Sequence, residues 1–312
     1  MGERKGRVVL AFAAVYLLWG STYLAIRFGV ETIPPFILAG LRHATAGVLL
    51  YLWTRRRSGV ARPRPKHWRA AFVVGGLMLL GGNGLVTWAE QRVPSGLAAL
   101  IVASVPIWMA ILSGLEKRRA PSGFVIFGLA LGLGGIGLLV SSGSLGGESV
   151  EPLGALALLT AALSWSIGSL ASRRVPLPSA TLTAVAMEMI GGGALLWITG
   201  LTFGEGARLH LSAISLKSAL SLGYLVIFGS LLGFSAYVWL LRVTTPARVS
   251  TYAYVNPIVA VLLGTLLGGE SLTLRIGLAA AGILAAVALI IRHGAEPKPA
   301  RREEPPIEEA VA

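Results

Sequence analysis

The sequence contains neither cysteine nor aspartate. The absence of cysteine excludes disulfides, thiolate metal sites and cysteine nucleophiles. All 14 acidic residues are glutamates, so carboxylate metal loops and aspartate-dependent phosphoryl-transfer sites are not expected. Charge is also scarce: 13% of the 312 residues are charged, against about 25% in an average soluble domain. We therefore expect no metal and no cofactor.

Apolar residues are abundant instead. They make up 54% of the chain, and its mean hydropathy is +0.74. Such a chain cannot cover itself with polar groups in water, so lipid is its expected solvent. Ten apolar segments come close to the roughly 20 residues that a helix needs to cross a bilayer. The composition therefore predicts an all-α polytopic membrane protein with ten transmembrane helices.

The same pattern occurs twice along the chain. An offset of 146 residues aligns Trp19 with Trp165 and Arg42 with Glu188. Each copy holds five apolar segments, and an odd number of spans inverts the second copy in the membrane. We therefore predict two inverted five-helix repeats, residues 1–147 and 148–294, followed by a disordered cytoplasmic tail over residues 295–312. Inverted repeats with a site at their midplane interface are typical of secondary transporters.

The positive charge indicates orientation. With ten spans, 21 lysines and arginines fall on one side of the membrane and five on the other. This imbalance predicts that both termini are cytoplasmic. The net charge of +13 is carried by short loops between apolar runs, so we do not expect nucleic acid as a partner. The expected partners are membrane lipid and a small-molecule substrate.

Two ionisable residues lie near the middle of predicted spans, Arg42 and Glu188. A charge at mid-helix costs roughly 2.5–3.5 kcal/mol on insertion scales, so neither residue is expected to face lipid. Either they line a polar cavity and bind a substrate or a coupling ion, or they pair with each other or with polar neighbours and lock the repeats together. Coupling to a proton stays open: Glu188 could exchange a proton, yet a nearby Arg42 would keep it ionised.

Aromatic and neutral polar groups complete the candidate cavity. Trp19, Trp108 and Trp165 lie deep in spans, where an indole N–H needs a partner, although deep packing is the alternative. Asn256-Pro257 predicts a locally broken helix, with Pro106 as its counterpart in the first repeat. The predicted substrate-binding residues are Trp19, Tyr23, Arg42, Asn83, Trp108, Trp165, Glu188, Ser235, Tyr252 and Asn256.

Several motifs resemble one known family. The stretch Leu18–Ala25, followed by Pro34-Pro35-Phe36 and Arg42, is similar to the first repeat of EamA-type members of the drug/metabolite transporter superfamily. The segment Gly268–Leu272 resembles the end of the second repeat. The resemblance covers nearly the whole chain. It implies ten helices in two inverted halves, a central cavity, and efflux of amino acids, drugs or other small metabolites across a bacterial inner membrane, without fixing a substrate.

Other functions are weighed against export. An uptake carrier or facilitator of the same fold is the main alternative, because sequence does not give the direction of transport. A membrane-embedded enzyme would need a nucleophile or a metal cluster at depth, and Glu188 has no nearby histidine, aspartate or cysteine motif. We therefore do not expect an enzyme. A purely structural membrane component is disfavoured by two buried charges that packing alone does not require.

Overall fold

The computed structural model describes residues 2–56, 61–116, 123–140, 150–249 and 251–293. Within these ranges the chain is helical and contains no strand. Seven segments are long and apolar enough to cross a membrane, and three shorter apolar helices cover Ile126–Leu138, Val255–Leu267 and Leu274–Leu289. The prediction of an all-α membrane protein is confirmed. The predicted tail lies outside the described residues.

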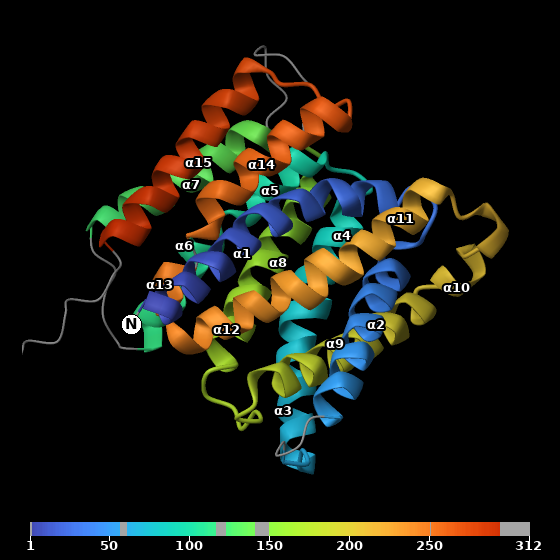
Figure 1. Ribbon diagram of the computed structural model, residues 1–312. Helices are drawn as coiled ribbons and strands as arrows, with labels where there is room; N and C mark the ends of the chain where they lie inside the picture. The colour runs from blue at the N-terminus through green and yellow to red at the C-terminus, as the bar shows by residue number, and fades with distance from the viewer. Residues whose placement is uncertain (1, 57–60, 117–122, 141–149, 250, 294–312) are drawn as a thin grey trace, which may run out of the picture.

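The helices follow one another with short connections (Figure 1). The first half contains α1 (Gly2–Gly29), α2 (Pro35–Arg55), α3 (Pro65–Gly75), η1 (Gly76–Gly84), α4 (Leu85–Ala89), α5 (Ser95–Val102), α6 (Val105–Glu116) and α7 (Gly123–Val140). The second contains α8 (Pro152–Ala171), α9 (Thr181–Thr202), α10 (Glu205–Arg208), η2 (Leu211–Ala213), α11 (Leu216–Tyr224), η3 (Leu225–Phe234), α12 (Ser235–Val243), α13 (Pro246–Val249), α14 (Tyr252–Leu267) and α15 (Leu274–His293). Here the first half means residues 1–147 and the second half residues 148–294.

Two long segments contain a wide turn in their middle. η1 and η3 are π-helical and join the α-helices before and after them into single rods, Pro65–Ala89 and Leu216–Val243. The offset of 151 residues that aligns Trp88 with Trp239 brings η1 and η3 into register within two residues. π-Helical turns are rare overall, but those that occur are often found at functional sites. Their occurrence at matching positions therefore marks these two rods as candidates for the site.

The two aligned prolines behave differently. Pro106 is the second residue of α6, and α5 ends just before it at Val102, as expected for a proline in the first turn of a helix. Pro257 lies inside α14, which continues through it from Tyr252 to Leu267. The predicted break at Asn256-Pro257 is therefore wrong. The proline removes one donor there, and the surrounding turns hold the helix together.

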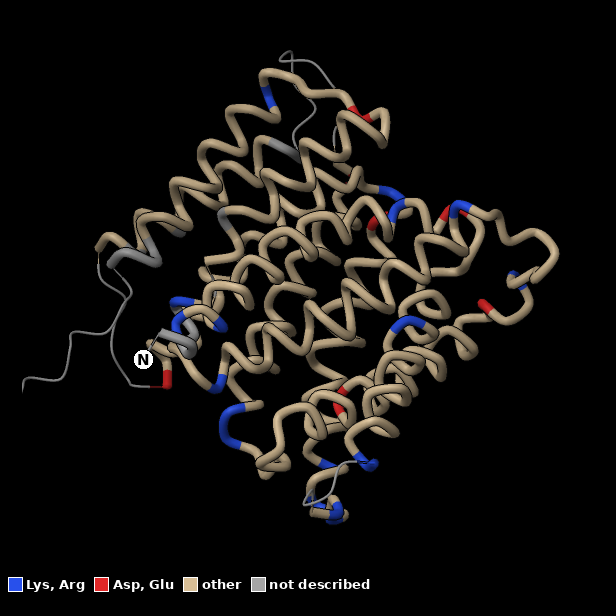
Figure 2. The backbone as a smooth tube through the Cα atoms, viewed as in Figure 1, with Lys and Arg blue, Asp and Glu red and all other residues tan. Residues whose placement is uncertain are grey.

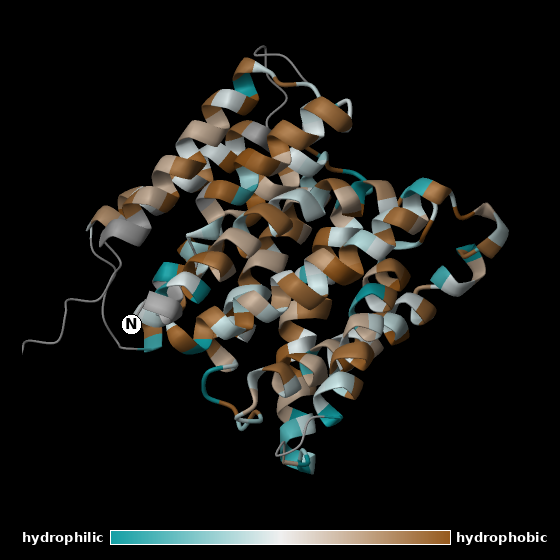
Figure 3. Cartoon of the chain, viewed as in Figure 1, coloured by the Kyte–Doolittle hydropathy of each residue, from teal (hydrophilic) through white to brown (hydrophobic). Residues whose placement is uncertain are grey.

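The surface of the bundle is apolar along its length. Large side chains such as Leu10, Leu115 and Leu266 are 70–74% exposed on their helices. Hydrophilic residues gather at helix ends and in connections (Figure 3), and lysines, arginines and glutamates lie mainly at the same places (Figure 2). This distribution is the one expected for helices whose outer faces contact lipid.

Close helix pairs hold the bundle together. α2 packs along α9, α7 along α15, and α1 along α14 (Figure 1). The α2–α9 contact is the most extensive of these and joins the two halves. Small residues permit it: an added Cβ on Gly193 would lie 2.6 Å from the backbone nitrogen of Ala44. Backbones approach this closely in lipid only through such residues.

Candidate functional site

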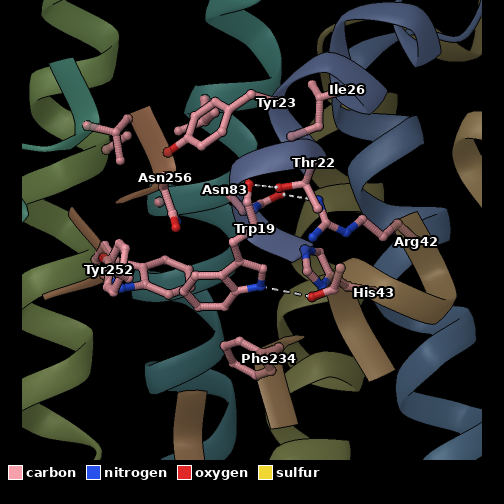
Figure 4. Close-up of a pocket in the computed structure, with 16 residues that line it drawn as sticks. Trp19, Thr22, Tyr23, Ile26, Arg42, His43, Asn83, Phe234, Tyr252 and Asn256 are labelled. Carbon is pink, nitrogen blue, oxygen red and sulfur yellow. Dashed lines mark hydrogen bonds between the residues drawn. The ribbon is translucent and has the colours of Figure 1, made fainter. Parts of the chain in front are cut away.

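A cavity lies inside the bundle. Both halves contribute to its wall, and the wide turns η1 and η3 both reach it (Figure 4). The lining residues are Trp19, Thr22, Tyr23, Ile26, Arg42, His43, Gly82, Asn83, Val86 and Val102 from the first half, and Ala161, Trp165, Gly229, Phe234, Tyr252 and Asn256 from the second. The wall is thus largely aromatic and apolar, with a few polar groups.

Arg42 supplies the cationic group in this wall. Its side chain is buried, and its Nε donates to Ser230 Oγ at 2.8 Å while Nη1 donates to Asn83 Oδ1 at 3.3 Å. An added Cβ on Gly229 would lie 2.6 Å from Arg42 Nη2, so a glycine is required for the guanidinium to sit there. The two bonds use two of its five N–H donors. Arg42 is therefore fixed between the halves by neutral groups and carries its charge at the cavity wall.

An aromatic cluster forms another part of the wall. The Trp19 indole donates from Nε1 to the carbonyl oxygen of Gly229 at 3.0 Å (Figure 4). This bond supplies the partner that a buried indole N–H was expected to need. The Trp19 ring meets those of Trp165 and Tyr252 edge-on, with centroids 5.4 and 5.6 Å apart. Trp165 Nε1 in turn donates to the hydroxyl of Tyr237 at 3.0 Å. The aromatic rings are held by one another and by hydrogen bonds, so the apolar wall is rigid.

Asn256 contributes an amide on α14. With its nitrogen directed at the carbonyl oxygens of Tyr16 and Tyr252, it donates to them at 3.0 and 3.3 Å. Its side chain is 3% exposed. Asn256 therefore ties α1 to α14 next to the cavity, and its amide oxygen remains as an acceptor.

Seven of the ten residues predicted from the sequence come together in this cavity: Trp19, Tyr23, Arg42, Asn83, Trp165, Tyr252 and Asn256. Trp108, Glu188 and Ser235 do not line it. Each of these three has a buried polar side-chain atom without a hydrogen-bond partner among the described residues. For them, placement in the cavity stays a prediction that this conformation does not support.

The predicted pairing of Arg42 with Glu188 is wrong in this structure. Arg42 bonds to Ser230 and Asn83, and neither carboxylate oxygen of Glu188 has a hydrogen-bond partner among the described residues. The two residues have different surroundings: the Arg42 side chain reaches Ser230 of η3, whereas the backbone carbonyl of Glu188 lies against Gly75 of α3.

The sequence did not single out several lining residues. Ile26, Val86, Val102, Ala161 and Phe234 are apolar, and from the sequence they cannot be told from residues that face lipid. His43 also lines the cavity beside Arg42, although neighbouring positions point in different directions around a helix. Glycine-rich stretches in two corresponding spans were the one available signal for the wide turns that place Gly82 and Gly229.

Glutamates of the second half cap helices of the first half at one end of the bundle. Glu270 accepts from the backbone nitrogen and the hydroxyl of Ser95, both at 2.6 Å, and from the backbone nitrogen of Gly96 at 3.0 Å. Glu205 accepts from the backbone nitrogens of Phe36 and Ile37 at 3.3 and 2.9 Å. These contacts satisfy free N–H groups at the starts of α5 and α2. We call this end of the bundle the Glu270 end.

Comparisons with known proteins agree with this architecture. A model of the EamA-like transporter family matches residues 6–141 and again residues 152–292. The inner membrane transporter YedA of Escherichia coli K12, itself uncharacterized, is 43% identical over 285 residues, covering 90% of this chain and 89% of YedA. A probable amino-acid metabolite efflux pump of the same strain is 28% identical over 282 residues, covering 85% and 88%. One protein of known crystal structure, 23% identical, shares the fold with a TM-score of 0.63 over 90% of this chain and 95% of its own. The chain belongs to the EamA-like transporter family.

Proposed function

We propose that this protein is a secondary transporter that exports small organic metabolites across the bacterial inner membrane by alternating access around the central cavity. The protein would act as a carrier and not as an enzyme. An uptake carrier or facilitator with the same fold is the alternative. The inner-membrane location is supported by the relative YedA, which carries that location in its name.

The observation that carries the proposal is the cavity and its wall. Sixteen residues from both halves line it, and Arg42 of the first half is bonded to Ser230 of the second. A site shared by two halves changes its access when the halves move relative to each other, and alternating access requires that property. A static channel would not need a charged group fixed between the halves.

The proposed architecture has ten spans in two inverted five-helix repeats, residues 1–147 and 148–294, with both termini in the cytoplasm. Seven long and three short apolar helices supply the spans. The family model matches each half once, over 6–141 and 152–292. The matched wide turns η1 and η3 also support the repeat. With this topology, the Glu270 end faces away from the cytoplasm.

The wall favours solutes with an apolar body and an anionic group. Trp19, Trp165 and Tyr252 offer flat apolar surfaces, and Arg42 offers a cation that binds carboxylates. Among the described residues, no acid lines the cavity. A zwitterion would therefore place its ammonium on amide or hydroxyl oxygens such as those of Asn83 and Asn256. The name of the efflux pump from Escherichia coli, which refers to amino-acid metabolites, is consistent with such solutes.

Transport into proteoliposomes tests the proposal. Protein is reconstituted and offered a panel of radiolabelled organic acids, amino acids and organic amines, with protein-free liposomes as the background. We expect uptake of at least one carboxylate above the background. Replacing Arg42 by Gln should raise the KM for that solute at least tenfold, because a charge-assisted bond is removed. The matched control is Arg248→Gln, which removes an exposed arginine outside the cavity.

Two results would contradict the proposal. If no member of the panel crosses above the background while the protein remains folded and inserted, the carrier function is not supported. If Arg42→Gln and Arg248→Gln transport with equal KM, the cavity is not the substrate site. Counterflow, in which an internal unlabelled solute accelerates uptake of the labelled one, distinguishes a carrier from a channel.

A further inference from the structure

Glu90 is a buried acid that is not part of the cavity wall. It follows α4 directly, is 0% exposed, and has two carboxylate oxygens without a hydrogen-bond partner among the described residues. Ionising a buried carboxylate without hydrogen-bond partners is unfavourable. A carboxyl in this position is therefore expected to be protonated, and to ionise only when water or another polar group reaches it.

Glu90 continues the cavity-facing stripe of its helix. Asn83 and Val86 line the cavity, and Glu90 follows them at spacings of seven and four residues, which place side chains on the same face of a helix. Two groups of the cavity wall, Tyr23 and Arg42, interact electrostatically with the Glu90 carboxyl. Glu90 thus lies just beyond the cavity, in the direction of the Glu270 end.

A second space lies close to Glu90, because Arg27 of its wall bonds to the Glu90 backbone. A surface pocket with an empty volume of about 1130 Å³ at the Glu270 end is lined by Arg27 and Glu270, among others. Both of these charged groups also interact electrostatically with Glu90. Arg27 Nη1 donates to the backbone carbonyl of Glu90 at 2.6 Å, so this cation is held beside the carboxyl. Glu90 is therefore linked to the groups of two separate spaces.

One further charged residue close in sequence to Glu90 is already paired. On the neighbouring turn, Arg92 forms an ion pair with Glu151, which precedes α8, at 3.2 Å. The charged and titratable groups that act on Glu90 are thus Arg27 and Tyr23 of α1, Arg42 of α2, and Glu270 after α14.

Contacts between the halves cross the Glu270 end. Besides the caps made by Glu270 and Glu205, Ser218 Oγ donates to the carbonyl of Phe28 at 2.7 Å, and Lys217 is paired with Glu31. These contacts close the bundle on the side where Glu90 lies. If Glu90 ionised here, it would place a second carboxylate beside that of Glu270.

We propose that Glu90 is the proton-binding site that couples solute export to proton entry, by permitting closure of the Glu270 end only when it is protonated. The proposal rests on the transport function proposed above. A proton would bind the carboxylate from the Glu270 end while that end is open. The neutral acid then tolerates burial, the end closes, and the proton leaves through the central cavity once the opposite end opens.

The expected pH dependence has a definite sign. In the closed structure the Glu90 carboxyl is buried without a hydrogen-bond partner among the described residues, so its charged form is disfavoured. In an open state, water reaches the carboxyl and the charged form is no longer disfavoured. A group that binds its proton more tightly in the closed state favours closure at low pH. Closure should therefore weaken as the pH rises.

Distances between spin labels test the proposal without a substrate. The native chain has no cysteine, so Gln91→Cys and Ser271→Cys, both at exposed positions of opposite halves, give a clean label pair across the Glu270 end. In lipid nanodiscs we expect the short-distance population to dominate at acid pH and to decline at alkaline pH, by up to tenfold per pH unit. Glu90→Gln, which mimics the neutral acid, should keep the short distance at every pH.

Glu188→Gln is the matched control, because Glu188 is the other fully buried acid in a predicted span whose oxygens have no partner. It should leave the pH response intact. An unchanged response in Glu90→Gln, or its loss in Glu188→Gln, would overturn the assignment. In proteoliposomes, Glu90→Gln should abolish the acceleration of transport by a pH gradient. If the native protein transports nothing but the label distances respond through Glu90, the transport function fails and the proton switch stands.

Discussion

Gly47 of α2 and Gly193 of α9 make equivalent contacts on opposite sides of one helix pair. An added Cβ on Gly47 would lie 2.8 Å from the backbone nitrogen of Ile190, and one on Gly193 would lie 2.6 Å from that of Ala44. The offset of 146 residues that aligns the two glycines also aligns Ala44 with Ile190. A contact that is reciprocal in this way is the signature of a two-fold interface, which supports the repeat architecture.

Alanine at either glycine should destabilise the protein. The added methyl group meets backbone atoms that cannot move aside, so we expect Gly47→Ala and Gly193→Ala each to lower the free energy of unfolding by about 1–3 kcal/mol. Gly134→Ala in α7 is the control, because an added Cβ there meets nothing within 4 Å. Thermal unfolding in detergent measures all three. Equal melting temperatures for the three variants would contradict the close contact.

Arg42 should be energetically coupled to Asn83 and not to Glu188. The Arg42–Asn83 hydrogen bond predicts a coupling energy of about 1 kcal/mol in a double-mutant cycle built from Arg42→Gln and Asn83→Ala. The cycle with Glu188→Gln should be additive within about 0.5 kcal/mol. Coupling of Glu188 above that of Asn83 would show that the pairing predicted from the sequence exists in the dominant conformation.

Glu188 should be replaceable by an apolar residue of similar size. Its carboxylate oxygens are buried and have no hydrogen-bond partner among the described residues, and the charged group that interacts with it is the exposed Arg242 at the end of α12. Removing a buried acid that gains no hydrogen bond is often neutral or stabilising, so Glu188→Met should leave the melting temperature unchanged or raise it. Arg42→Met, by contrast, strands Ser230 and Asn83 and should lower it. A large loss of stability in Glu188→Met would point to a partner reached in another conformation.

Cavity access can be followed by cysteine labelling. Asn83→Cys should react with a small, polar thiol reagent, since Asn83 lines the cavity and the chain has no native cysteine. Thr183→Cys is the control, because Thr183 is 1% exposed and does not line the cavity. Excess transported solute should slow labelling at Asn83. Equal rates at both positions would argue against the cavity as drawn in Figure 4.

The sequence predicted those parts of the site that carry unusual chemistry for lipid. Arg42, Asn83 and Trp19 stand out because a charge, an amide or an indole N–H inside a span needs a partner, and all three line the cavity. Glu188 stood out for the same reason but lies elsewhere, since the direction of a side chain depends on the packing of its helix. That packing depends on glycines whose role becomes visible only when both helices are placed.

Two other features could not be predicted correctly from the sequence. The helix through Pro257 stays continuous, although the sequence suggested a break, because tertiary contacts outweigh the loss of one backbone hydrogen bond. Glu90 was not singled out, because it falls at the end of an apolar segment, where a charge usually meets water. Only the fold shows that it is fully buried.

The final prediction concerns topology. If the Lys and Arg imbalance sets orientation, Arg62 before α3 lies in the cytoplasm and Arg208 after α9 lies on the opposite side. Both are exposed, so cysteine at either position is reachable from its own side only. In right-side-out membrane vesicles, a membrane-impermeant thiol reagent should label Arg208→Cys at once and Arg62→Cys only after permeabilisation. Labelling of both from outside would indicate leaky vesicles, and the native chain checks for background. Immediate labelling of Arg62→Cys alone would invert the topology, place the Glu270 end in the cytoplasm, and turn the proposed proton entry at Glu90 into proton release.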